Sequence, residues 1–135
     1  RGCVSGRFTL GLESDGTVKG CPSLPTASYA GGNVRELSIA RIWEESPELN
    51  FVQQRDRSEL WGFCAGCYYA DLCMAGCSWT AHCTLGRRGN QPYCYHRAHT
   101  LKRRGLRERL EPVEVAEGLP FDHGRFELVE EPWAP

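Results

Sequence analysis

The chain is organised around a cysteine-rich run, Phe63-Cys64-Ala65-Gly66-Cys67-Tyr68-Tyr69-Ala70-Asp71-Leu72-Cys73-Met74-Ala75-Gly76-Cys77. This run carries four of the eight cysteines within fourteen residues, in the spacing C-x2-C-x5-C-x3-C. An ordinary hydrophobic core needs no thiols at that density, so we interpret the run as the place where metal is held. The remaining cysteines are then predicted to be distant ligands that fold the chain back onto it.

Length and composition are those of one ordinary globular domain. Of the 135 residues, 41% are hydrophobic and 24% are charged, and fifteen glycines and eight prolines predict a loop-rich protein with short elements. The net charge of −1 gives no global attraction to nucleic acid or membrane, and no apolar run approaches the roughly 18 residues of a membrane span. The chain starts without a methionine or a charged-then-apolar leader, which suggests a piece of something longer.

Eight cysteines are compatible with four disulfides, a metal framework or scattered free thiols. Disulfide scaffolds are usually shorter, secreted and denser in cysteine, and nothing in this sequence marks secretion. We therefore favour metal. A metal framework of thiolates implies a reducing compartment, and we expect the cytoplasm.

The N-terminal part has the pattern of a β-hairpin. Residues 7–13 alternate as a half-buried strand does, with three apolar side chains on one side, which are Phe8, Leu10 and Leu12. The Asp-Gly turn at residues 14–17 and the return strand at residues 18–19 follow. Cys3 and Cys21 then lie near the open end of one hairpin. Two core cysteines could coincide there, but the geometry favours two ligands of one metal site.

Short helices are predicted after the hairpin. Residues 22–34 are interpreted as a loop, because glycine and proline recur through them. Ser38 can cap a short helix, whose apolar stripe is Ile39, Ile42 and Trp43. Ser46 and Pro47 form the cap and first turn of a second helix.

The second half of the chain is predicted to hold further helices. Residues 78–85 form one or two helical turns before Gly86. Asn90 caps a longer helix, with Pro92 in its first turn, that stops at Gly105. Cys94 falls early on this helix, where a thiolate feels the helix N-terminus and has a lowered pKa, which favours metal ligation.

The acidic, proline-containing end of the chain carries one predicted strand, around residues 126–129. Together these elements predict an α+β fold: a small loop-rich metal-anchored domain with an N-terminal β-hairpin followed by short helices. Much of its stability is expected to come from the metal, because ligand-rich loops bury little apolar surface of their own.

Four thiolates can hold either zinc or an iron–sulfur cluster, and C-x2-C pairs serve both. Only two, five and three residues separate the four cysteines of the central run. These segments are too short for all four thiols to bind one metal site without strain. Two sites, to which Cys3, Cys21 and Cys94 also contribute, would accommodate the seven cysteines without that strain.

The cysteine pattern resembles a known family. Cys3, then twelve residues, then Gly16-Thr17-Val18-Lys19-Gly20-Cys21 matches C-x(9–15)-G-x4-C, and the central run with Cys94 completes seven cysteines. This pattern resembles the SPASM domain, the C-terminal auxiliary-cluster domain of radical SAM peptide and protein maturases. The resemblance covers roughly residues 3–100. It implies a SPASM-like auxiliary iron–sulfur domain over residues 1–110 and a C-terminal extension over residues 111–135.

The resemblance implies two [4Fe–4S] clusters and a ligand set for each. The ligands implied for the first cluster are Cys3, Cys21 and Cys77. Those implied for the second are Cys64, Cys67, Cys73 and Cys94. In fully ligated family members the fourth ligand of the first cluster lies upstream of Cys3, so three explanations stay open: the ligand was cut off, the iron has an open position for substrate, or Cys83 substitutes.

The family resemblance also implies partners. S-adenosylmethionine is expected to be bound by a separate barrel domain, since the third cysteine of C-x3-C-x2-C is replaced by Thr80. This radical SAM barrel domain, a peptide or protein substrate and a redox donor or acceptor protein are the expected partners, without nucleic acid or membrane. The implied function is that of an oxidoreductase domain in peptide maturation, serving electron transfer and substrate positioning. The first cluster would lie nearer the substrate.

Other candidate residues have simpler interpretations. The four histidines (His82, His96, His99 and His123) are interpreted as surface or neighbouring residues rather than ligands. Tyr68 and Tyr69 are expected to shield a cluster from water, and Asp71 to be a solvated carboxylate. The basic stretch at residues 102–109 could dock an acidic partner, although a solvated helix face is the simpler interpretation. No catalytic acid, base or nucleophile is nominated.

A second function class uses the same thiolates. A zinc-binding structural or interaction module would need four of them for a closed site. Zinc ribbons pair one C-x2-C with another, and no second C-x2-C occurs in this sequence. The spacing therefore favours iron–sulfur clusters over zinc.

Overall fold

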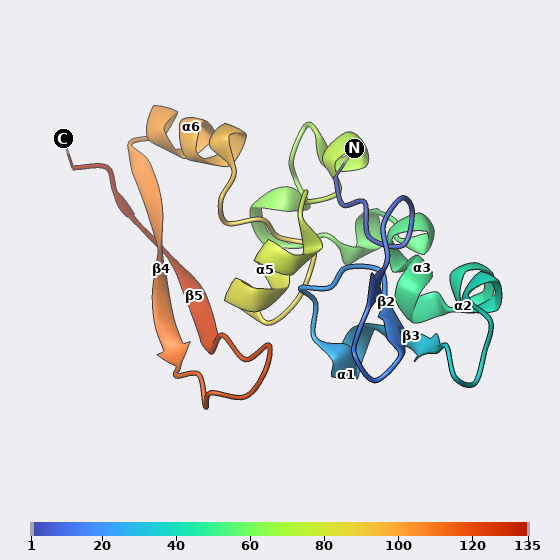
Figure 1. Cartoon of the computed structure of the whole chain (residues 1–135). Coiled ribbons are helices and arrows are strands. Elements are labelled where there is room, and N and C mark those ends of the chain that lie inside the picture. Colours follow the sequence, from blue (N-terminus) through green and yellow to red (C-terminus); the bar gives the residue numbers. More distant parts are fainter. Residues whose placement is uncertain (1, 135) are drawn as a thin grey trace.

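A small antiparallel sheet forms the N-terminal part of the computed structural model, which describes residues 2–134 (Figure 1). Its strands are β1 (Gly11–Leu12), β2 (Thr17–Lys19) and β3 (Ala30–Asn33), in the order β1-β2-β3. The Asp-Gly turn joins β1 to β2 as the sequence predicts: Gly16 has φ +93°, and Asp15 Oδ1 accepts a hydrogen bond from the Thr17 N–H at 2.9 Å.

The predicted half-buried strand over residues 7–13 is wrong in extent. The strand is only two residues long, because the chain turns at residues 4–8, where the N–H groups of Arg7 and Phe8 both donate to Val4 O. Phe8 is 77% exposed and Leu12 is 58% exposed, so the apolar alternation lies on the surface rather than in a core.

The predicted loop at residues 22–34 is also wrong, since it contains a helical turn, α1 (Thr26–Tyr29), and strand β3. Glycine is needed in β3 for packing. A Cβ on Gly31 would lie 2.8 Å from Ser46 Oγ and 3.1 Å from Leu49 Cβ, so the absence of a side chain lets the next helix approach. Here glycine marks a close contact, and only the three-dimensional arrangement distinguishes that from a loop.

Two capped helices follow, as predicted: α2 (Ile39–Glu45) and α3 (Pro47–Gln54). Ser38 Oγ accepts from the Arg41 N–H, and Ser46 Oγ accepts from the Leu49 N–H. Buried Val18, Ile42 and Leu49 then form one hydrophobic cluster between the sheet and these helices.

The cysteine-rich middle of the chain is made of short turns and helices. Two 3-10 helices (Arg57–Glu59 and Gly62–Cys64) lead into α4 (Ala70–Cys73), α5 (Ser78–Leu85) and α6 (Tyr95–Arg103). The predicted ends at Gly86 and Gly105 are confirmed, and both glycines have φ +72°. The predicted start of α6 is wrong: Cys94, not Asn90, is its N-cap, so Cys94 precedes the helix.

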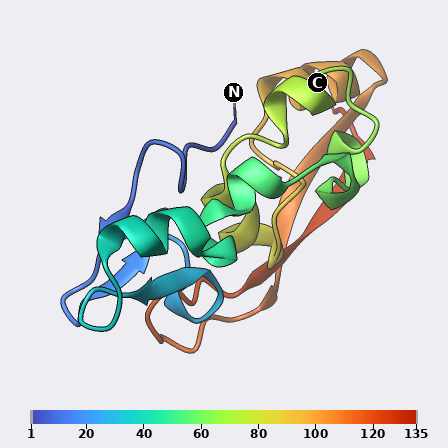
Figure 2. The same cartoon turned by 90° about the vertical axis from the view of Figure 1, so that its right-hand side faces the viewer.

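The C-terminal part is a long β-hairpin, β4 (Leu106–Glu114) with β5 (Arg125–Pro132). The predicted strand at residues 126–129 lies within β5, whereas β4 was not predicted, and the domain boundary expected at residue 110 falls inside β4. The hairpin lies on the side of the molecule opposite α2 and packs against α5 and α6 (Figures 1 and 2).

The connection between β4 and β5 contacts the N-terminal sheet. The Phe121 ring lies 3.9 Å from Lys19 Nζ, which is fully buried and also bonds Glu13 and Leu24 O. The loop between β4 and β5 is thereby in contact with β2, although the cysteine-rich run lies between them in the sequence.

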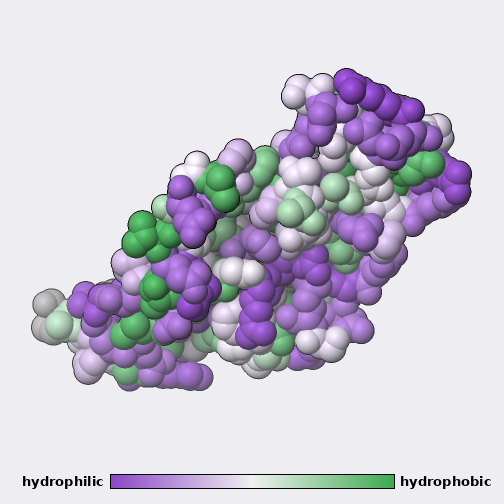
Figure 3. All heavy atoms as spheres, turned by 90° about the horizontal axis from the view of Figure 1, so that it is seen from below, coloured by the Kyte–Doolittle hydropathy of each residue, from purple (hydrophilic) through white to green (hydrophobic). Residues whose placement is uncertain are grey.

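The architecture confirms the predicted α+β class, with a small antiparallel sheet, a second hairpin and short helices. Within residues 2–134, none of the helices has the length and apolar character that crossing a membrane requires. Hydrophilic residues cover most of the face in Figure 3, where hydrophobic ones form small separate groups.

The helix-sheet cluster gives a first testable prediction. Replacing Leu49, which is 0% exposed, by alanine should lower the free energy of unfolding by about 3 kcal/mol, because it leaves a cavity between β3 and α3. Denaturant unfolding of the metal-free protein measures the loss. The matched variant Leu12→Ala removes an exposed leucine and should change the value by less than about 0.5 kcal/mol. Equal losses in the two variants would contradict this packing.

Candidate metal centre

The thiols of the N-terminal part share one hydrophobic surface. Cys3 and Cys21 both pack, partly buried, against the cluster of Leu24, Tyr29, Phe51 and Val52. Trp79, at the start of α5, packs against the same cluster. Cys3, Cys21 and Trp79 therefore lie in one region of the fold. Trp79 is two positions after Cys77.

Cys77 is the N-cap of α5. Burial raises the pKa of its thiol, but the hydroxyl and N–H of Thr80 and the N–H of Trp79 more than offset this, so the pKa is lowered. This position favours the thiolate form that binds metal.

The three residues between Cys73 and Cys77 have an unusual backbone conformation. Met74, Ala75 and Gly76 have φ values of +48°, +58° and +62°, all in the left-handed region. Two of them carry a Cβ, which makes this conformation unfavourable by about 1–2 kcal/mol per residue. Ala75 is 5% exposed and packs with Leu60 and Cys64, so burial helps to hold the turn. The C-x3-C spacing is thus a tight reversal rather than a helix.

The thiols of the C-x2-C pair accept hydrogen bonds from backbone N–H groups. The Gln91 N–H donates to Cys64 Sγ and the Tyr69 N–H donates to Cys67 Sγ, each at 3.4 Å. Such bonds stabilise the charged form of sulfur and tune cluster potentials. The Gln91 side chain also donates to Cys77 O at 3.5 Å, so one residue contacts both ends of the central run.

Neighbouring thiols and burial act together on Cys64. Burial raises the pKa of its thiol, and the adjacent Cys94 and Cys67 raise it further, against the opposing effects of the Gln91 N–H and of Arg97. The charges of two other thiols predicted for the second cluster, Cys94 and Cys67, thus act on Cys64.

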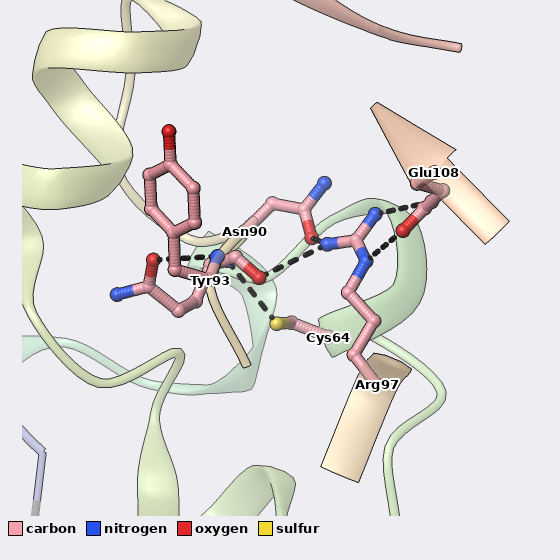
Figure 4. A network of polar contacts seen from close by, with 6 residues as sticks. Cys64, Asn90, Tyr93, Arg97 and Glu108 are labelled. Carbon is pink, nitrogen blue, oxygen red and sulfur yellow. Dashed lines mark hydrogen bonds and ion pairs between the residues drawn. The ribbon is translucent and has the colours of Figure 1, made fainter. Parts of the chain in front are cut away.

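A buried polar network fixes the segment that carries these contacts (Figure 4). Arg97, on α6, is 3% exposed and bonds both carboxylate oxygens of Glu108, at 2.5 and 2.7 Å. The same guanidinium donates to Asn90 Oδ1 at 2.7 Å and to Gln91 O at 3.1 Å. Residues 90–91 are thus held between α6 and β4 while the Gln91 N–H faces Cys64.

The predicted ligand sets are not assembled into a closed site. All eight cysteines carry free thiols, and within residues 2–134 no group of three or more Cys, His, Asp or Glu side chains could hold one metal ion. The ligand assignments, Cys73 included, therefore stay predictions. Cys83 donates to Thr80 O at 3.4 Å, and burial, with Cys77 nearby, raises the pKa of its thiol.

The surroundings of the thiols fit an iron–sulfur cluster in their chemistry. Thiolate is the ligand that such clusters take, and N–H groups already face two of the sulfurs. Ser5 Oγ is a buried hydroxyl with no hydrogen-bond partner within the described residues. It lies beside Gly20, where a Cβ would be 2.4 Å away, next to Cys21. This unpartnered hydroxyl therefore lies beside the segment that carries Cys21.

The histidines have aromatic rather than thiol neighbours. His82 shares a hydrogen bond with the Tyr29 hydroxyl at 3.1 Å, and burial, together with Arg88 and His123, lowers the pKa of His82. The other ring contacts are Phe63–His96, Tyr69–His96, Trp79–His123 and Tyr95–His99.

The remaining candidates lie on the surface. Tyr68 is 88% exposed, and Asp71 pairs with exposed Arg57 at 3.2 Å. The basic stretch is not one solvated helix face, because it runs from α6 into β4, where Arg107 and Arg109 both pair with Glu131. These internal ion pairs already occupy the charges of Arg107 and Arg109, so the stretch does not favour docking of an acidic partner.

Sequence reasoning missed the two residues that organise the site, Arg97 and Gln91. Nothing in the local pattern marks them, because both act on thiols that are distant along the chain. The available signal was the position of Arg97 in the first turn of α6, because a charged residue three positions after a predicted ligand, here Cys94, lies close to it at the start of a helix.

A comparison with protein families matches residues 3–68 to the SPASM model, described as an iron-sulfur cluster-binding domain. The match contains Cys3, Cys21, Cys64 and Cys67 and ends before Cys73. A comparison with curated proteins finds no relative.

The buried network gives a second prediction. Glu108→Ala leaves the buried Arg97 charge without its carboxylate and should lower the free energy of unfolding by about 3 kcal/mol. Amide hydrogen exchange should also speed up at residues 90–97. The matched variant Glu45→Ala removes an exposed partner of Arg41 and should change stability by less than about 0.5 kcal/mol. Unchanged exchange at residues 90–97 in Glu108→Ala would show that the network does not hold this segment.

Proposed function

Residues 3–68 belong to the SPASM family of iron–sulfur cluster-binding domains, and from this premise we propose that the chain is the auxiliary [4Fe–4S] domain of a radical SAM enzyme. The enzyme modifies a peptide or protein substrate. The domain serves electron transfer and substrate positioning, in the cytoplasm, beside a barrel domain that binds S-adenosylmethionine. The observation that carries the proposal is the match over Cys3, Cys21, Cys64 and Cys67.

The division of the thiols supports two clusters rather than one. Cys3 and Cys21 pack on the hydrophobic cluster that contains Tyr29 and Phe51. Cys64 is buried with Leu60 and Ala70 in a separate hydrophobic cluster. The first set would be Cys3, Cys21 and Cys77, and the second would be Cys64, Cys67, Cys73 and Cys94. Clusters bound there supply one-electron transfer at potentials that the surrounding hydrogen bonds and charges tune.

A cavity beside the first set supports the role in substrate positioning. It has a volume of about 370 Å³, and its lining includes Tyr29, Trp61, His82 and Arg88. Tyr29 links it to the first set, because Tyr29 and Cys3 pack on the same cluster. The cavity offers aromatic rings, the Tyr29–His82 hydrogen bond and a guanidinium, which can orient a polar peptide segment. A redox donor or acceptor protein would complete the electron path.

A zinc-binding structural or interaction module is the second candidate function. The free thiols of the C-x2-C pair could supply two of the four ligands that a structural zinc site needs. Metal content separates the two functions directly.

The third prediction concerns this metal content. Protein purified without oxygen should be brown, with about eight irons and eight sulfides per chain when both clusters are full. Iron and sulfide assays together with electron paramagnetic resonance of the reduced protein measure this. A colourless protein with stoichiometric zinc would show that the iron–sulfur assignment is wrong.

The fourth prediction tests the ligand sets. Cys67→Ala should reduce the iron content by about half, from about eight to about four, and loosen residues 60–100. The thiol of Cys67 lies in a loop and is only partly buried, so its loss alone removes little packing. Iron assay and hydrogen exchange measure both effects.

Cys83→Ala is the matched variant, because it removes a thiol that lies outside the seven-cysteine pattern. It should retain full iron, since the Cys83 thiol already bonds Thr80 O within α5. Full iron in Cys67→Ala would contradict the assignment of the second set. Loss of iron in Cys83→Ala would instead identify Cys83 as the fourth ligand of the first set.

A further inference from the structure

Arg55 lies where the two predicted ligand sets meet. It is the residue that ends α3, and its side chain extends toward the cysteine-rich run. One guanidinium nitrogen, Nη1, donates to Ser78 Oγ at 3.4 Å, and Ser78 directly follows Cys77. The other, Nη2, would lie 3.0 Å from a Cβ on Gly2, which directly precedes Cys3.

Cys73 completes this arrangement from the other ligand set. The same Cβ on Gly2 would lie 2.6 Å from Cys73 O, so the N-terminal segment and the end of α4 are in contact beside the guanidinium. Gly2 has φ +63°, and a side chain there would displace one of these neighbours. Arg55 thus touches the immediate surroundings of Cys3, Cys73 and Cys77.

The charge of Arg55 has no direct carboxylate partner among the described residues. Within residues 2–134, no Asp or Glu oxygen lies within ion-pair distance of its guanidinium, although the group is partly buried. Burial lowers the pKa of Arg55, and the groups that raise it are Glu59, Cys3 and Cys73, against Arg88. Glu59 is itself paired with Arg88 at 3.0 Å. A partly buried cation requires compensating negative charge, and a cluster bound by the neighbouring cysteines would supply it.

We propose that Arg55 is a positioning residue that compensates the negative charge of the clusters at the junction of the two ligand sets. This inference rests on the proposed function. Each electron added to a thiolate-ligated cluster adds one negative charge, and a fixed cation nearby favours that reduced state. Arg55 therefore raises the reduction potential of at least one cluster, and its bond to Ser78 keeps the charge in place.

The neighbouring arginines differ from Arg55 in this respect. Arg57 is exposed and paired with Asp71, and Arg88 is paired with Glu59. Their charges are already neutralised locally, so their removal would change the field at the thiols less than removal of Arg55.

The experiment compares three variants of the anaerobically purified protein. Arg55→Gln removes the charge but retains a hydrogen-bond donor, Arg55→Lys retains the charge, and Arg41→Gln removes the same charge from an exposed position on α2. Redox titration followed by electron paramagnetic resonance gives the midpoint potentials, and iron assay gives the cluster content.

The expected result is a shift of at least one midpoint potential to a more negative value in Arg55→Gln. Arg55→Lys should restore most of that shift, and Arg41→Gln should leave the potentials unchanged. If Arg55→Gln loses iron instead, retention of iron in Arg55→Lys supports charge compensation. Equal loss of iron in both Arg55 variants would overturn it, because packing alone would then explain the residue.

Unchanged potentials in an iron-loaded Arg55→Gln would also overturn the inference. That outcome differs from failure of the proposed function, which would show as a wild-type protein that binds no iron. The two conclusions are therefore tested separately by the same set of samples.

Discussion

The buried ion pair between Arg97 and Glu108 is the interaction on which the ligand-bearing half of the molecule depends. A charge that is 3% exposed is stable only when each of its donors has a partner, and this guanidinium finds them on β4 and on residues 90–91. Satisfying it therefore joins α6, the C-terminal hairpin and the segment before Cys94 in one arrangement. Since the Gln91 N–H faces Cys64 in that arrangement, the hairpin at the end of the chain helps to position a thiol near its middle.

Hydrophobic packing supplies less order here than the polar network does. The buried apolar residues form three separate clusters of three or four residues, and two of the three contain or contact a cysteine of the predicted ligand sets. Small separate clusters bury little surface each, so the free energy of metal binding becomes a large part of the folding free energy. The left-handed turn between Cys73 and Cys77 fits this view, because its unfavourable backbone must be held by something other than a large core.

Local chemistry is what the sequence could predict. The serine caps of α2 and α3, the Asp-Gly turn and the glycine stops of α5 and α6 all depend on neighbouring residues. The errors occur where a distant contact decides. The sequence predicts a loop at Gly31 because the contact of Gly31 with Leu49 leaves no trace in the neighbouring residues. It predicts a helix cap at Asn90 because the bond of Asn90 to Arg97 leaves none either. The family pattern identified candidate ligands, but no local rule identifies the groups that surround them.

The two partly or fully buried arginines of the ligand region illustrate why the net charge of −1 says little about the site. Arg97 is paired with Glu108, so its charge is largely neutralised within the pair, although it still opposes the rise in the pKa of Cys64. Arg55 has no such carboxylate among the described residues, and its partly buried guanidinium lies beside Gly2 and Ser78, which directly adjoin Cys3 and Cys77. A single uncompensated cation placed between two anionic groups lowers their mutual repulsion as well as the energy of each. Clusters bound at the proposed ligand sets would be anionic groups of this kind, and the proposed role of Arg55 follows from its place beside Ser78 and Gly2, which adjoin Cys77 and Cys3.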